Sequence, residues 1–105
     1  MQNSIENLEE LIVKNKNKLL LIDFFLIHCP PCQKLMPHLE QIKKEKPDIE
    51  IIKINGYENF DLAKKYNITS YPSLLLYKNT KLIKKNVGYL SLSELLTFIK
   101  DDIED

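Results

Sequence analysis

The two cysteines of this 105-residue chain lie three positions apart, in Cys29-Pro30-Pro31-Cys32. They follow an apolar run that reads as a strand and precede a stretch with helical spacing. At a helix N-terminus, unpaired N–H groups and the helix dipole favour a thiolate, which lowers a cysteine pKa from about 8.5. A second cysteine one turn later can resolve the mixed disulfide that the first one forms. The motif therefore predicts dithiol–disulfide exchange.

The two prolines between the cysteines fit the first turn of a helix, because N–H groups there have no intrahelical partner to lose. Neither Pro30 nor Pro31 has an N–H to donate. The N–H of Cys32 is therefore the nearest main-chain donor left for the Cys29 sulfur.

The same cysteine spacing also occurs in zinc sites. Zinc would need two further ligands, for which only His28 and His38 are available, and His28 adjoins Cys29 in a geometry poorly suited to joint ligation. A non-enzymatic zinc or binding module is thus a weaker alternative to exchange chemistry, and we expect no bound metal. His38 is expected to be a surface residue without a role.

An acidic residue interrupts the apolar run before the cysteines. Asp23 lies six positions before Cys29, and burial without a partner would raise its pKa by desolvation. Such a carboxyl suits a proton acceptor for Cys32, directly or through water. Lys53, in the next predicted strand, would lower that pKa if its ammonium lay nearby, and would otherwise be a solvated strand residue.

Composition narrows the class of protein. With 105 residues and 44% hydrophobic content, residues 1–105 fit a single domain. Fifteen lysines balance fifteen acids, so there is no excess positive charge for nucleic-acid binding. Two glycines are too few for a P-loop or a dinucleotide fingerprint. The N-terminus lacks signal-peptide features and the apolar run is too short to span a membrane, so we expect a cytoplasmic protein.

Hydrophobic periodicity predicts eight elements in the order helix, strand, helix, strand, helix, strand, strand, helix. A crossover would make the first two strands parallel, and the hairpin would extend the sheet antiparallel. The hairpin turn at residues 78–81 lacks the Asn-Gly signal. The expected elements are a helix capped by Ser4, strand 19–26, helix 30–46, strand 49–54, helix 58–66, strands 74–77 and 82–87, and a helix that starts at a Ser91–Glu94 capping box and reaches Ile103.

Several separated landmarks together resemble the thioredoxin family, essentially without gaps from about residue 18 to 100: Ile22-Asp23-Phe24-Phe25, the cysteine motif, Pro37, Ser70-Tyr71-Pro72-Ser73 and Val87-Gly88. The resemblance implies the thioredoxin fold, here a four-stranded mixed sheet flanked by four helices, with the N-terminal strand absent or vestigial in residues 1–3. It implies that Cys29 attacks, Cys32 resolves, Asp23 is a buried carboxylate beneath the dithiol and Lys53 is the lysine near it.

The resemblance also implies a client-binding surface around the dithiol, formed by His28, Pro30, Pro31, Tyr71, Pro72 and Gly88. Pro72 matches the family's cis-proline, which would let Tyr71 main-chain groups pair with an extended substrate. Gly88 would allow close approach to this groove. Pro30 replaces the usual glycine, as in tryparedoxin and nucleoredoxin, and His28 replaces a tryptophan.

By resemblance, the chain is expected to reduce disulfides in client proteins as a monomer. The dithiol is itself the redox centre, so no cofactor is required, and a thioredoxin reductase-type donor would regenerate it. Clients of the family include ribonucleotide reductase, peroxiredoxin and methionine sulfoxide reductase. Tyr71, which is similar to its counterpart in protein disulfide isomerase, and His28 leave open an oxidant or isomerase with a higher reduction potential.

Overall fold

The computed structural model describes residues 7–100 and contains the eight expected elements in the expected order. Most boundaries fall within one or two residues of those expected from the sequence. The elements are α1 (Leu8–Lys14), β1 (Leu19–Phe25), α2 (Pro30–Glu45), β2 (Glu50–Asn55), α3 (Phe60–Lys65), β3 (Ser73–Lys78), β4 (Lys81–Val87) and α4 (Leu92–Ile99).

Two expectations near the N-terminus fall on residues that the structure does not describe, namely the vestigial strand at residues 1–3 and the cap at Ser4. The last helix was expected to reach Ile103, but it ends at Ile99, because the C-cap Lys100 has extended rather than helical backbone angles. Within the described residues, Asn7 caps α1, because its side-chain oxygen accepts a 3.0 Å hydrogen bond from the N–H of Glu10.

The strands form one mixed sheet in the order β2-β1-β3-β4. β1 pairs with β2 in parallel and with β3 antiparallel, and β4 extends the sheet antiparallel to β3. This topology confirms the predicted four-stranded mixed sheet. β1 is an inner strand, and its residues Leu20 to Phe24 are buried, as expected for a strand with helices on both faces.

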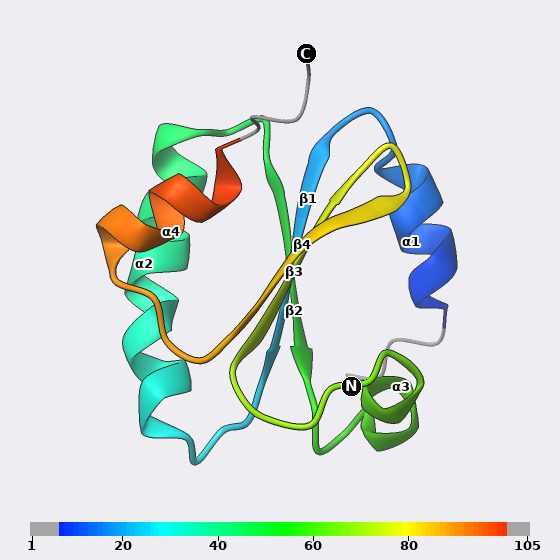
Figure 1. Cartoon of the computed structure of the whole chain (residues 1–105), viewed down its shortest axis with the longest axis vertical. Helices are drawn as coiled ribbons and strands as arrows, with labels where there is room; N and C mark the ends of the chain where they lie inside the picture. The colour runs from blue at the N-terminus through cyan, green and yellow to red at the C-terminus, as the bar shows by residue number, and fades with distance from the viewer. Residues whose placement is uncertain (1–6, 101–105) are drawn as a thin grey trace.

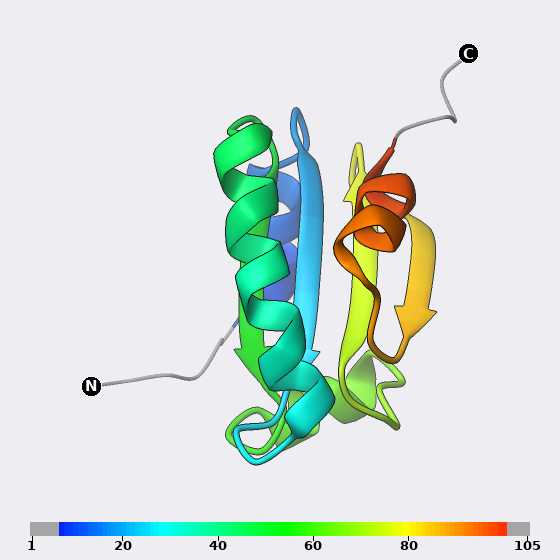
Figure 2. The ribbon, with the colours of Figure 1, turned by 90° about the vertical axis from the view of Figure 1, so that its left-hand side faces the viewer.

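Helices cover both faces of the sheet: α2 and α4 lie on one side, and α1 and α3 on the other (Figures 1 and 2). Side chains alternate along β1, so Leu20, Ile22 and Phe24 pack in the core under α1 and α3, whereas Leu21 packs in the core under α2 and α4. By the same alternation, Asp23 faces the α2 side. The acid within the apolar strand is therefore turned toward the helix that begins at the cysteines.

The β3–β4 hairpin closes through a two-residue turn. Lys78 pairs with Lys81, and between them Asn79 and Thr80 both have positive φ angles, of 53° and 69°. Positive φ at both central positions is the geometry of a type I′ turn, which matches the twist of the flanking strands. The turn forms without the glycine that normally makes this conformation favourable, with the β-branched Thr80 in its place.

Candidate active site

The candidate site lies at one end of the sheet, where β1 and β2 end and α2 begins (Figure 1, bottom). The segment that leads into β3, with Tyr71 and Pro72, reaches the same end. Ligand sites commonly form outside the carboxyl ends of parallel strands, because loops from neighbouring strands converge there.

The two cysteines form a disulfide across the first turn of α2, with their Cα atoms 5.2 Å apart. Cys29 is the N-cap, in extended conformation, and its sulfur accepts a 3.3 Å hydrogen bond from the N–H of Cys32. This bond confirms the donor expected from the two prolines. Cys29 retains 8% of its surface exposed, whereas Cys32 is completely buried. Only the first cysteine of the pair therefore has surface open to a partner.

The peptide bond between Tyr71 and Pro72 is cis, and the main-chain oxygen of Tyr71 lies 3.9 Å from the Cys29 sulfur. Pro72 is buried, and its carbonyl accepts a 2.8 Å hydrogen bond from the N–H of Gly88. The structure thus brings Cys29, Tyr71, Pro72 and Gly88 together, although they come from three distant parts of the sequence.

Gly88 has a φ of 106°, a conformation that side-chain-bearing residues rarely adopt, and a Cβ placed there would meet no described atom within 4 Å. The side of Gly88 where a side chain would stand is therefore open, although its N–H is bonded to Pro72. Its conformation explains the residue type, and the space beside it is open.

Asp23 is completely buried, and neither of its carboxyl oxygens has a hydrogen-bond partner among residues 7–100. Burial raises its pKa to about 7, and the positive charge of Lys53 opposes that rise with a smaller effect. Lys53 is exposed and aligned with Asp23 in the β1–β2 register, so water weakens its influence. The carboxyl can therefore take up or release a proton near neutral pH.

The other expected residues differ in exposure. Pro30 and His28 are exposed, whereas Pro31 is half-buried in the first turn of α2. The expectation for His38 was wrong: its side chain is half-buried, and its Nε2 shares a 2.8 Å hydrogen bond with the hydroxyl of Tyr89. A contact between residues so far apart in sequence leaves no local signal.

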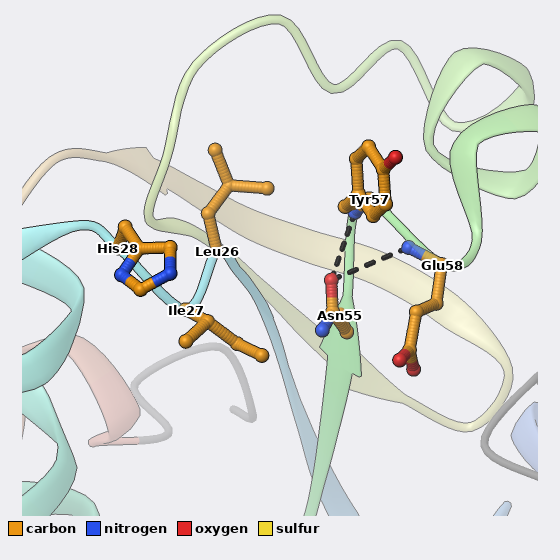
Figure 3. A pocket seen from close by; sticks show the side chains of 6 residues that line it. All are labelled: Leu26, Ile27, His28, Asn55, Tyr57 and Glu58. Carbon is orange, nitrogen blue, oxygen red and sulfur yellow. Dashed lines mark hydrogen bonds between the residues drawn. The ribbon is translucent and has the colours of Figure 1, made fainter.

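Sequence reasoning missed a pocket of about 490 Å³ beside the cysteines, lined by Leu26, Ile27, His28, Asn55, Tyr57 and Glu58 (Figure 3). It also missed the role of Gly56, which is buried under the ring of Tyr71, where a Cβ would overlap that ring. Tyr57 directly follows Asn55-Gly56 at the end of β2, and this aromatic residue was the sequence signal that could have indicated the pocket.

Two further properties concern the described residues as a whole. Residues 7–100 contain no group of three or more His, Cys, Asp or Glu side chains arranged to hold a metal ion. None of the helices in this part of the chain has the length and apolar character needed to cross a membrane.

A disulfide between cysteines three residues apart at a helix start, set against a cis-proline on a four-stranded mixed sheet, defines a thiol–disulfide oxidoreductase of the thioredoxin fold. The thioredoxin family pattern matches residues 2–101, and the chain belongs to this family. It carries the family's dithiol–disulfide exchange function through Cys29 and Cys32, and the oxidant or isomerase alternative is not favoured.

Known proteins with similar sequence or structure agree with this assignment. A thioredoxin of Buchnera aphidicola is 38% identical over 99 residues, which cover 93% of this chain and 91% of the relative. Fasciola hepatica thioredoxin superposes with a TM-score of 0.84 at 32% identity, covering 92% of each chain. A chain from a structure on thiol resolution in yeast mitochondrial 1-Cys peroxiredoxin via glutathione/thioredoxin systems has a TM-score of 0.81 at 33% identity, covering 94% of this chain and 93% of that one.

Proposed function

We propose that Cys29 is the sulfur that attacks client disulfides and that Cys32 resolves the mixed disulfide. The difference in exposure between the two cysteine residues carries this assignment, because 8% of Cys29 is accessible and none of Cys32 is. A thiolate at Cys29 would also gain the Cys32 N–H bond and the dipole of α2.

The reaction transfers two electrons to the client. The Cys29 thiolate attacks one sulfur of the client disulfide, forms a Cys29–client disulfide and releases the other client sulfur as a thiolate, which takes a proton from water. The Cys32 sulfur then loses its proton and attacks Cys29. This step forms the Cys29–Cys32 disulfide and releases the second client thiol, so the client is reduced and the protein oxidised.

Asp23 is proposed to accept the proton of Cys32 in the second step. A carboxyl with a pKa of about 7 is partly ionised at neutral pH and is therefore a suitable base, directly or through a water molecule. Lys53 would tune this base, since its charge favours the ionised form.

The client is proposed to bind as an extended segment along the main chain of Tyr71, with the open space beside Gly88 on one side and His28, Pro30 and Pro31 on the other. The 3.9 Å between the Tyr71 oxygen and the Cys29 sulfur supports this placement.

Residues 1–105 would act as one monomeric, cytoplasmic thioredoxin-like domain without a cofactor. A thioredoxin reductase-type donor would return electrons. Clients would include peroxiredoxins, because the similar yeast structure concerns thiol resolution in a 1-Cys peroxiredoxin.

Trapping with Cys32→Ser tests the assignment of the two sulfurs. This variant can attack but cannot resolve, so it should accumulate mixed disulfides with clients that mass spectrometry maps to Cys29. The matched Cys29→Ser variant should trap nothing, because Cys32 is buried. Trapping by Cys29→Ser at the level of Cys32→Ser would reverse the assignment.

A further inference from the structure

The end of the sheet opposite the cysteines holds a small cleft that the exchange chemistry does not use (Figure 1, top). Two turns form this lysine cleft, one between α1 and β1 and the other between β3 and β4. It is lined by Lys16, Asn17, Lys18, Leu19, Lys78 and Asn79. We propose that the lysine cleft binds a single phosphate group, as carried by a small phosphorylated molecule. None of its residues belongs to the candidate active site, so this binding would not depend on the exchange function.

Every ionisable side chain that lines the lysine cleft is a lysine. Lys16 and Lys18 come from the first turn, and Lys78 is the last residue of β3. Lys81 pairs with Lys78 across the hairpin and adds a positive charge beside the lining. Like charges directly opposite each other on two strands disfavour the fold, so an anion bound beside them would offset their repulsion. Several ammonium groups around one cleft favour an ion with more than one negative charge, and lysine is a common phosphate-binding residue.

One carboxylate competes for these lysines. Glu50 lies 3.7 Å from the ammonium of Lys18, and the two side chains are 36% and 52% exposed. An ion pair with this exposure contributes little to stability, because water screens it. Lys18 can therefore turn from Glu50 to a bound anion at small cost. Within residues 7–100, Lys16 makes no salt bridge.

The size of the lysine cleft fits a compact ion. Its volume is about 130 Å³, whereas pockets for drug-sized molecules are about 300–1,000 Å³. A single water molecule needs about 10–15 Å³, so the cleft has room for a tetrahedral phosphate with part of its hydration shell. The side-chain amides of Asn17 and Asn79 supply uncharged N–H donors to the same space. The rest of a phosphorylated molecule would remain in solvent.

Hydrogen bonds shape the first wall of the cleft. The N–H of Lys16 donates a 3.1 Å bond to the carbonyl of Val13, and the N–H of Lys18 donates a 3.0 Å bond to the carbonyl of Asn15. The side chain of Asn15 in turn donates a 2.8 Å bond to the carbonyl of Leu11. The other wall is the hairpin turn, whose position is fixed by the pairing of β3 with β4. A preformed backbone leaves only side chains to be ordered on binding, which lowers the entropic cost.

A residue-resolved titration tests the proposal with the full-length protein. Inorganic phosphate is added at about pH 7.5 and constant ionic strength, balanced with sodium chloride, while NMR follows the amide chemical shifts. The amides of residues 16–19 and 78–80 should shift and saturate. Three lysines that each contribute about a fivefold factor in water correspond to a dissociation constant of about 10 mM. Shifts that do not saturate by about 100 mM, or that are equally large in every lysine-bearing segment, would overturn the proposal.

Lysine-to-glutamine variants locate the ion, and the amide spectrum of each variant shows whether it is folded. Lys16→Gln and Lys78→Gln should each raise the dissociation constant about fivefold, and the double variant about 25-fold. Lys44→Gln removes an exposed charge in the last turn of α2, outside the cleft, and should change the constant by less than about twofold. A double variant that bound phosphate as tightly as the wild type would place the ion elsewhere and overturn the proposal.

A further comparison separates a soluble phosphate from a charged membrane surface. Glycerol 3-phosphate carries one phosphate in solution, whereas vesicles of phosphatidylcholine with about 20% phosphatidylserine carry negative charge in a plane. Glycerol 3-phosphate should reproduce the shifts caused by inorganic phosphate, and the vesicles should not compete with it. Vesicle binding that inorganic phosphate does not displace, together with no saturable response to glycerol 3-phosphate, would assign the lysines to a membrane surface and overturn the proposal.

Discussion

The two ends of the sheet differ in how well their side chains satisfy the requirements of a stable fold. At the cysteine end, Asp23 is buried without a hydrogen-bond partner among the described residues, and Tyr57 is 83% exposed. At the opposite end, Lys43 donates to the carbonyls of Pro47 and Ile49, at 3.3 and 2.7 Å, and Lys18 lies 3.7 Å from Glu50. The cysteine end therefore retains features that cost stability.

This difference follows from what each end does. A buried carboxyl costs free energy through desolvation, and exposed apolar surface forgoes burial. With total stabilities of about 5–15 kcal/mol, a small domain tolerates such features where chemistry requires them. The comparison predicts that changes at the cysteine end alter reactivity or its pH dependence, whereas changes elsewhere alter stability alone.

The largest effect is expected for the attacking sulfur. Cys29→Ser should lower the rate of client disulfide reduction at least about 1,000-fold, because a serine hydroxyl is a far weaker nucleophile than a thiolate. Reduction of a protein disulfide under excess dithiothreitol, with the uncatalysed rate subtracted, measures it. Under the same reducing conditions, Cys29→Ser should unfold in urea close to the wild type. A variant that retained activity would remove the chemical basis of the comparison.

The next effect concerns the pH dependence of stability through Asp23. Its pKa rises from an ordinary 3.8 to about 7 on folding, first through desolvation and with Lys53 opposing. The native state therefore holds its proton over a pH range in which the unfolded state has released it. The stabilising contribution is present below about pH 4 and is lost as the pH rises through about 7, a difference of about 4 kcal/mol.

Asp23→Asn cannot ionise, so it should abolish this dependence. Urea denaturation of the oxidised protein between pH 4 and 8 should show wild-type stability falling with pH and the variant nearly level by comparison. Asp48→Asn, an exposed acid at the opposite end, should retain the wild-type slope. Equal slopes in Asp23→Asn and the wild type would show that Asp23 carries no folding cost.

A change in the core under α2 and α4 should affect stability without affecting chemistry. Leu21 is completely buried, and Leu21→Ala should lower the free energy of unfolding by about 3 kcal/mol. Leu82→Ala, at a 49% exposed position on β4, should cost much less. Where both variants are folded, their rates of disulfide reduction should match the wild type. A slower rate in folded Leu21→Ala would mean that packing beside Asp23, on the same face of β1, also tunes the site.

The sequence predicted the parts of this molecule that rest on local patterns. Asp23 was recognisable because it interrupts an apolar run, and the capping box of Ser91 and Glu94 is present as expected. The pocket was not predictable, because parallel pairing of β1 and β2 brings its two walls together. The contact of His38 with Tyr89 also depends on tertiary packing. Long-range contacts of this kind leave no periodic signal.

The hairpin turn at the opposite end offers the smallest and most specific test. Thr80 has a φ of 69°, which is unfavourable for a β-branched residue, while the register of β3 and β4 imposes it. Thr80→Gly creates the Asn-Gly pair typical of this turn and should stabilise the protein by about 1 kcal/mol, measured by urea denaturation. Lys81→Gly, at the first residue of β4, should instead destabilise it by about 0.5–1 kcal/mol, since glycine is unfavourable in a strand. Because the turn lies far from the cysteines, neither change should alter disulfide reduction. If Thr80→Gly destabilised the protein, or slowed its chemistry, the separation between a reactive end and a structural end would fail.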